Sequence, residues 1–293
     1  MKKTIFTGAG VAIITPMFED GSVNFDKLGE LIDEQIAEGT DSIVICGTTG
    51  ESSTLTDEEH IECIRYAVKK VGGRVPVVAG TGSNDTAYAR AMSIDAEKAG
   101  ADGLLLVTPY YNKTSQKGML AHFVTVADAV DIPIILYNVP SRTGCRIEIG
   151  TYKELAEHPN IVAAKEASGD ISLVARLAAE TDLDIYSGND DQTVAVMSLG
   201  GKGVISVASN VIPRQMHMMA ELALKGDFKG AAEMQLKYLE LMNELFCDVN
   251  PIPVKEAMNL MGKGVGECRL PLVRMDEGKV DGLRNVLRKY GLV

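Results

Sequence analysis

Eight short apolar segments, each followed by a stretch with helical periodicity, constrain the fold of this chain more than any other feature. Their starts are 19 to 33 residues apart, which is the length of one strand plus one helix. Between the first two, Leu28, Leu31, Ile32 and Ile36 recur three and four residues apart, as on one face of a helix. The predicted strands cover residues 11–15, 42–46, 75–79, 103–107, 132–137, 161–165, 184–187 and 203–207.

These segments are continuously apolar rather than alternating, as residues 43–45 and 104–107 illustrate. Burial on both faces is typical of a parallel sheet covered by helices, and eight such units predict an α/β protein with the (β/α)8 TIM-barrel fold. An open, doubly wound sheet is the alternative, but no G-x-G-x-x-G follows the first strand.

The last part of the chain keeps helical periodicity without a further strand. We therefore expect a barrel over residues 1–225 and a C-terminal helical appendage over 226–293, with a break between two helices at Asn250-Pro251-Ile252-Pro253.

The composition of the chain argues against several classes of function. The 293 residues carry a formal net charge of −11, which argues against nucleic-acid binding. No apolar run approaches the ~20 residues that cross a bilayer, so we expect no membrane association and a cytoplasmic location. The cysteines are odd in number and form no C-x-x-C pair, and the four histidines are scattered, so we expect neither a metal nor a cofactor.

In this fold the functional side chains lie at the carboxyl ends of the strands, and Lys165 is the exception among those ends because it terminates an apolar run. If residues 161, 163 and 165 face the barrel interior, the small Ala163 leaves room for a partly desolvated amine whose pKa is lowered. Such a lysine can form a Schiff base with a carbonyl. An ion pair with Glu166 is the other interpretation that the spacing allows.

Tyr137 ends the preceding strand, so its phenol is expected beside the Lys165 amine, where it can shuttle protons. A tyrosine that merely caps the core fits equally well. The segment 47–52 lacks the lysine of a nucleotide-binding loop, and it is better suited to presenting amides and hydroxyls to a carboxylate.

Five motifs in order along the chain resemble those of the dihydrodipicolinate synthase family, which belongs to the class I pyruvate aldolase-like enzymes. They are Gly47-Thr48-Thr49-Gly50-Glu51-Ser52, Pro109-Tyr110-Tyr111-Asn112, Tyr137-Asn138-Val139-Pro140-Ser141-Arg142-Thr143-Gly144, Lys165-Glu166-Ala167-Ser168-Gly169 and Gly203-Val204-Ile205-Ser206. The resemblance implies a metal-free lyase. It would hold pyruvate as a Schiff base on Lys165 and condense it with L-aspartate-4-semialdehyde to 4-hydroxy-tetrahydrodipicolinate, in lysine and diaminopimelate biosynthesis.

The same resemblance implies roles for individual residues. The catalytic group would be Lys165 with a proton relay of Thr48, Tyr137 and Tyr111, the last reaching in from a neighbouring subunit. The substrate-binding residues would be Thr49 for the pyruvate carboxylate, Arg142 for the semialdehyde carboxylate, and Gly188 and Ile205 around the imine. The family is usually a homotetramer, a dimer of dimers, so we expect a homo-oligomer here.

Relatives inhibited by lysine bind it at a subunit interface. The matching positions here are Ser52, Ser53, Asp57, His60, Asn84, Tyr88 and Tyr110. Asp57 replaces a common histidine and Tyr88 replaces a glutamate that pairs with the inhibitor's ammonium, so we expect weak or absent lysine inhibition.

Two alternatives stay open. Another pyruvate-dependent class I aldolase, such as an N-acetylneuraminate lyase or a keto-deoxy sugar acid aldolase, would share the lysine and the tyrosine. It would not be expected to carry Arg142-Thr143-Gly144 together with Tyr110-Tyr111. A catalytically silent barrel that binds small molecules is the alternative from another class.

Overall fold

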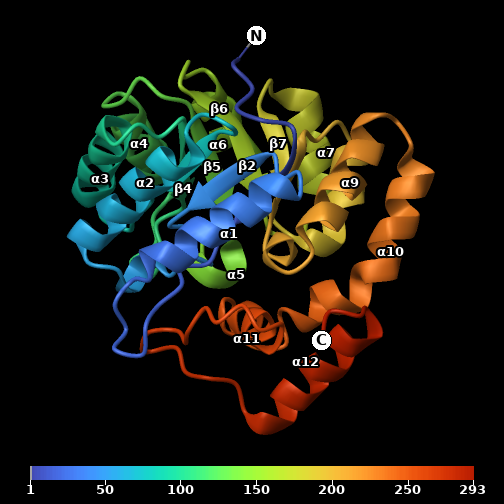
Figure 1. The fold of residues 1–293 in the computed structure, drawn as a ribbon. Helices are drawn as coiled ribbons and strands as arrows, with labels where there is room; N and C mark the ends of the chain where they lie inside the picture. The colour runs from blue at the N-terminus through green and yellow to red at the C-terminus, as the bar shows by residue number, and fades with distance from the viewer. Residues whose placement is uncertain (1) are drawn as a thin grey trace.

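The computed structural model describes residues 2–293 and contains, within them, eight parallel strands closed into a barrel (Figure 1). Each strand pairs with the next along the chain, and β8 pairs with β1. The predicted (β/α)8 TIM barrel is confirmed. The strands are β1 (Gly8–Ala12), β2 (Ser42–Ile45), β3 (Val77–Gly80), β4 (Gly103–Val107), β5 (Ile134–Asn138), β6 (Ile161–Glu166), β7 (Asp184–Ser187) and β8 (Gly203–Ser206).

Helices surround the barrel and continue beyond it. They are α1 (Phe25–Ala37), α2 (Asp57–Val71), α3 (Thr86–Lys98), α4 (Gln116–Ala127), α5 (Pro140–Thr143), α6 (Ile149–Ala156), α7 (Ile171–Glu180), α8 (Thr193–Ser198), α9 (Pro213–Leu224), α10 (Phe228–Glu244), α11 (Ile252–Leu260) and α12 (Glu277–Lys289). Short 3-10 turns lie at Ser52–Thr54, Asp190–Gln192 and Ala208–Asn210.

The first strand was predicted at residues 11–15, and the structure places it three residues earlier, at Gly8–Ala12. Gly8 and Gly10 both lie within this strand. A β-carbon at Gly10 would come within 2.8 Å of the Phe6 ring, so the lack of a side chain there makes room for that ring.

Two apolar layers stabilise the barrel. The larger layer lies between the strands and the helices, and the smaller one fills the interior with side chains such as Val44, Val78 and Ile135. At the amino-terminal end the interior is closed by Phe6 and Tyr186, whose rings stack with centroids 4.4 Å apart. The barrel interior is therefore packed at its amino-terminal end, and in this fold the site is expected at the carboxyl ends of the strands.

The C-terminal helices lie around the open end. In Figure 1, α10 descends beside the barrel, and α11 and α12 lie below it, on the side where α5 follows β5. The break predicted at residues 250–253 is confirmed, because α10 ends at Glu244 and α11 begins at Ile252. The proposed division at residue 225 falls in the turn between α9 and α10 and stays a prediction. None of the helices in residues 2–293 has the length and apolar character needed to cross a bilayer.

Candidate active site

Lys165 lies near the carboxyl end of β6 and points into the mouth of the barrel. Its strand neighbours in register are Tyr137 of β5 and Tyr186 of β7. Only 6% of its surface is exposed, and its Nζ lies 4.2 Å from the centre of the Tyr137 ring. The predicted proximity of the amine and the phenol is confirmed, because parallel strands in register place residues of equal depth side by side.

Glu166 faces the opposite side of the same strand. Its carboxylate accepts hydrogen bonds from Asn138 Nδ2 (3.0 Å), the Tyr152 hydroxyl (3.1 Å) and the Ser168 amide (2.8 Å). The alternative that paired Lys165 with Glu166 is therefore wrong, since consecutive strand residues point to opposite faces.

The environment lowers the pKa of Lys165 to about 8. Burial is the main cause; the Arg142 guanidinium lowers it further, and the Asp190 carboxylate acts in the opposite direction. At pH 7 about one-tenth of the amine is then neutral, against roughly one in 3,000 for an ordinary lysine. The structure thus supplies a nucleophilic amine at neutral pH.

Tyr137 provides a proton donor next to this amine. Burial raises the pKa of its phenol, while the Arg142 guanidinium and a hydrogen bond with Thr48 lower it. The phenol stays protonated at neutral pH, and its contact with Thr48 gives the proton a path to a second hydroxyl.

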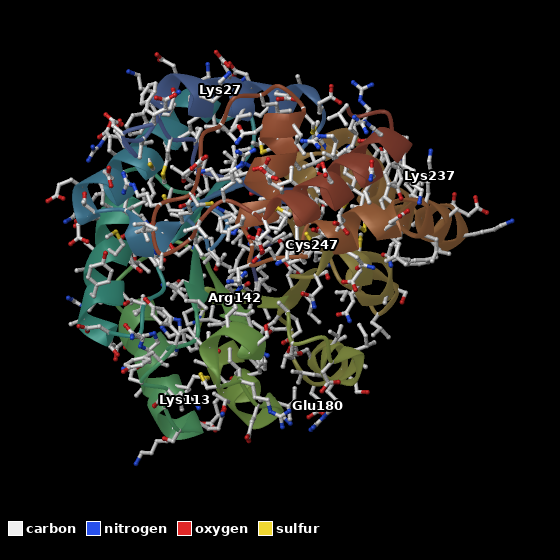
Figure 2. The ribbon with its side chains drawn as sticks, turned by 90° about the horizontal axis from the view of Figure 1, so that it is seen from below. Lys27, Lys113, Arg142, Glu180, Lys237 and Cys247 are labelled. Atoms are coloured by element: carbon white, nitrogen blue, oxygen red, sulfur yellow. The ribbon has the colours of Figure 1, made fainter. Side chains whose placement is uncertain are left out.

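A cavity of about 310 Å³ opens at this point. It is lined by the predicted residues Thr48, Thr49, Tyr137, Arg142, Lys165 and Gly188, and by Phe246, Asp248, Val249 and Asn250 from the segment between α10 and α11. Seen from below in Figure 2, Arg142 lies near the centre of the molecule, close to Cys247 of that segment.

Arg142 is carried by α5, a single helical turn that follows β5. Pro140 at the first position and Gly144 at the C-cap, with φ +71°, limit this helix to a single turn. The Arg142 Nη2 donates to the Asn250 carbonyl at 3.1 Å, which leaves the other guanidinium donors for a ligand.

Position 188 requires a glycine because its backbone approaches Ala167 and Lys165 closely. A β-carbon at this position would lie 2.6 Å from Ala167 Cβ and 3.2 Å from Lys165 Cε. Ile205 lies deeper, among the apolar side chains of the barrel interior. Both positions therefore shape the space around the amine by packing.

Tyr111 is the predicted catalytic residue that this chain does not bring to its own cavity. It lies in the loop after β4, has a left-handed backbone (φ +66°) and is 91% exposed. An aromatic side chain so fully exposed is available to a second copy of the chain.

Sequence reasoning missed the contribution of Asp190 and of the segment around Asn250. The Asn250 side chain donates to Thr49 Oγ1 at 3.0 Å, and Asp190 is buried behind Lys165 with its Oδ2 on the Val207 and Ala208 amides. The Asn-Pro-Ile-Pro break was visible in the sequence, but nothing local indicated which loop it would contact.

Most positions of the predicted feedback site line a second cavity, of about 580 Å³. They are Ser52, Ser53, Asp57, His60, Tyr88 and Tyr110. Asn84 does not line it; its carbonyl accepts a hydrogen bond from Asn112. Thr48 and Arg142 border both cavities, so the two are adjacent.

Within residues 2–293, no group of three or more histidine, cysteine, aspartate or glutamate side chains is arranged to hold a metal ion. The chemistry that can be read from the side chains is that of an amine, a phenol, hydroxyls and a guanidinium around one small cavity.

This fold and site define a (β/α)8 barrel with a buried, nucleophilic amine and a guanidinium in one small cavity at the carboxyl ends of its strands. The Dihydrodipicolinate synthetase family pattern matches residues 5–290, and the chain belongs to that family.

Known proteins agree with the assignment. A 4-hydroxy-tetrahydrodipicolinate synthase from Lachnoclostridium phytofermentans is 59% identical over 292 residues, covering 99% of both chains. The chloride-inhibited dihydrodipicolinate synthase of Acinetobacter baumannii, solved with pyruvate, superposes with a TM-score of 0.97 at 43% identity over 99% of this chain and 100% of that one. The Cyanidioschyzon merolae enzyme, solved with lysine bound, gives 0.96 at 40% identity over 99% and 100%.

Proposed function

We propose that this chain is a 4-hydroxy-tetrahydrodipicolinate synthase, a lyase that condenses pyruvate with L-aspartate-4-semialdehyde in lysine and diaminopimelate biosynthesis. The family and the names of the full-length relatives support this reaction. The observation that carries it is the buried Lys165 amine of lowered pKa beside Tyr137, in a cavity that also presents Arg142.

The chemistry begins when the neutral Lys165 amine attacks the pyruvate carbonyl and water leaves, which forms an iminium ion. The iminium withdraws electrons from C3, so a proton is lost there and an enamine forms. The enamine carbon attacks the semialdehyde's aldehyde carbon, whose oxygen takes up a proton. The substrate's own amine then attacks the imine carbon, closes the ring and displaces Lys165.

Each remaining residue has a role that its position supports. Thr48 and Tyr137, joined by a hydrogen bond, move protons to and from the substrate oxygens, and Tyr111 of a second subunit extends this relay. Thr49 binds the pyruvate carboxylate. Arg142 binds the semialdehyde carboxylate, a planar, two-pronged contact that guanidinium makes well.

The proposed relay needs more than one chain. Because Tyr111 is exposed and does not line the cavity of its own chain, we infer a homo-oligomer in which each Tyr111 completes a neighbour's site. The family resemblance implies that this oligomer is a tetramer built as a dimer of dimers. The five free cysteines also fit a reducing compartment, and a cytoplasmic location stays our prediction.

Trapping with borohydride tests the proposal directly. We expect pyruvate plus borohydride to leave one covalent adduct per chain, mapped by peptide mass spectrometry to Lys165. Lys165→Met should abolish the adduct, whereas Lys153→Met, which changes a surface lysine paired with Glu180, should leave it unchanged. A wild-type chain without an adduct would favour the silent barrel.

A second assay separates the synthase from related aldolases. Pyruvate would be supplied with either aspartate semialdehyde or a sugar-derived aldehyde, and we expect turnover only with the semialdehyde. Turnover of the sugar alone would overturn the assignment of the second substrate.

A further inference from the structure

The loop that carries Thr48 and Thr49 is bounded by two residues in an unfavourable backbone conformation. Cys46 has φ +54° and Glu51 has φ +57°, and neither is a glycine. Residues with a β-carbon adopt this left-handed region only where surrounding contacts impose it. The contacts that hold Glu51 therefore also fix the course of the loop.

The Glu51 carboxylate is held by the C-terminal segment, more than 200 residues away. Its Oε1 accepts from Lys255 Nζ of α11 at 2.8 Å, and its Oε2 accepts from the Arg269 amide at 2.9 Å. The two side chains of the ion pair are only 1% and 2% exposed. Lys255 also donates to the Glu267 carbonyl at 2.7 Å, so its ammonium is anchored on both sides.

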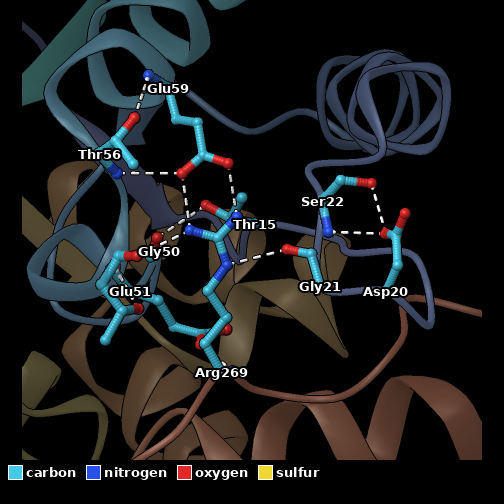
Figure 3. Close-up of polar contacts among 10 residues, drawn as sticks. Thr15, Asp20, Gly21, Ser22, Gly50, Glu51, Thr56, Glu59 and Arg269 are labelled. Carbon is cyan, nitrogen blue, oxygen red and sulfur yellow. Dashed lines mark hydrogen bonds and ion pairs between the residues drawn. The ribbon is translucent and has the colours of Figure 1, made fainter.

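Arg269 is itself fixed to the barrel. Figure 3 shows its guanidinium facing Glu59, whose two carboxylate oxygens lie 2.6 Å from its nitrogens. It also donates to the carbonyls of Gly21 and Thr54. Arg269 thus contacts α2 through its side chain and Glu51 through its backbone amide.

The same segment reaches the site at a second point, since Asn250 donates to Thr49 Oγ1 at 3.0 Å. Asn250 is five residues before Lys255. The two contacts hold the loop at Thr49 and at Glu51.

A fully buried ion pair is an inefficient way to stabilise a fold, because desolvation of both charges offsets most of their attraction. We propose that Glu51 and Lys255 are positioning residues: their ion pair holds the loop of Thr48 and Thr49 so that Thr49 meets the pyruvate carboxylate. This inference rests on the proposed function. In it, the C-terminal helices set the geometry of the keto-acid site.

Removing the charges singly and together tests the proposal. Lys255→Met leaves Glu51 buried and unpaired, whereas Glu51→Gln with Lys255→Met removes both charges and should recover most of the lost melting temperature. We expect the KM for pyruvate to rise at least tenfold in the single variant and at least threefold in the double variant. The limiting rate of adduct formation at saturating pyruvate should fall less than threefold in the double variant.

The control is Arg274→Gln, which removes a partly exposed pair with Glu256 in the same segment. Its KM should match that of the wild type. The readout is the rate of borohydride-trapped adduct formation against pyruvate concentration, which needs no second substrate, at a temperature where circular dichroism shows every variant folded. If the single variant does not fold, the pyruvate KM of the double variant alone tests the proposal.

A pyruvate KM within threefold of wild type in the double variant would overturn the proposal and leave the ion pair a purely structural feature. Failure of the proposed function is distinguishable: a silent barrel would form no pyruvate adduct in the wild-type chain, and another aldolase would form the adduct but would not turn over aspartate semialdehyde.

Discussion

Two charges of opposite sign lie near Lys165. They adjust the pKa of its amine and therefore the fraction that is neutral and reactive. The Arg142 guanidinium lowers the pKa of Lys165 and the Asp190 carboxylate raises it, while burial provides the larger shift that brings it to about 8. Since only the neutral amine attacks a carbonyl, imine formation should accelerate as the pH rises through this value.

We predict that the two neighbours move this profile in opposite directions. Arg142→Met should shift the midpoint of adduct formation to higher pH, and Asp190→Asn should shift it to lower pH, each by roughly 0.5 to 1 unit. The measurement is the rate of borohydride-trapped pyruvate adduct between pH 6 and pH 10. Identical midpoints in both variants and the wild type would show that these charges do not act on Lys165.

Two residues of the second cavity, Asp57 and Tyr88, underlie the predicted response to lysine. In the second cavity the Tyr88 hydroxyl donates to Asp57 Oδ1 at 2.7 Å, so the position that holds a glutamate in lysine-sensitive relatives offers no carboxylate. A lost charge-assisted hydrogen bond costs about 1.5 to 3 kcal/mol, which weakens binding tenfold or more.

We therefore predict weak or absent lysine inhibition, measured by titration calorimetry and by the initial rate with added lysine. The variant that combines Tyr88→Glu with Asp57→His should bind lysine at least tenfold more tightly than the wild type. Low-micromolar binding to the wild-type chain would contradict the prediction.

At the scale of elements, the ends of β5 and β6 are joined by the outward-facing carboxylate of Glu166. It connects Asn138 of β5 with Tyr152 of α6 and with the Ser168 amide, and all of these contacts lie just behind Lys165 and Tyr137. Burial raises the pKa of Glu166, and its three donors counteract that rise. The network satisfies a buried carboxylate while it aligns the two strands.

We predict that Glu166→Ala lowers the free energy of unfolding by about 2 to 4 kcal/mol, because the buried Asn138 and Tyr152 groups lose their acceptor. The change would be measured by denaturant titration. Glu180→Ala, which removes surface ion pairs with Lys153 and Arg176, should cost less than about 1 kcal/mol. Equal costs for the two variants would contradict the role of the network.

For the whole molecule, the proposed role of the exposed Tyr111 predicts that catalysis depends on the assembly of subunits. If each Tyr111 serves a neighbour, Tyr111→Phe and Lys165→Met subunits are each nearly inactive alone. In a mixed dimer, however, one of the two sites combines an intact Lys165 with an intact Tyr111.

We predict that mixing the two variants, followed by subunit exchange, restores activity toward half the wild-type value per mixed dimer. Sedimentation would confirm the assembly, and a mixture of Lys165→Met with Lys165→Ala serves as the control that cannot recover. Unchanged activity after verified exchange would place Tyr111 outside the partner's site.

Much of this architecture follows from local patterns. Apolar runs identified all eight strands of residues 2–293, although β3 and β5 begin two residues later than predicted. The largest displacement, three residues, is that of β1, because glycines that serve close packing resemble glycines that end a strand. Lys165 and Tyr137 were found together because parallel register fixes which residues of adjacent strands are neighbours. The ion pair of Lys165 with Glu166 was excluded by the alternation of strand faces, although the sequence alone left it open.

Local patterns were enough to predict the barrel, the lysine at the end of the sixth strand and the phenol beside it, since the periods of strands and helices are local properties of the chain. The surroundings of these groups became visible in the folded chain: Asp190 near the amine, Asn250 on Thr49 and Lys255 on Glu51. The last two contacts join residues more than 200 positions apart, and they depend on how a C-terminal helix packs across the barrel mouth. No local pattern of side chains encodes that packing.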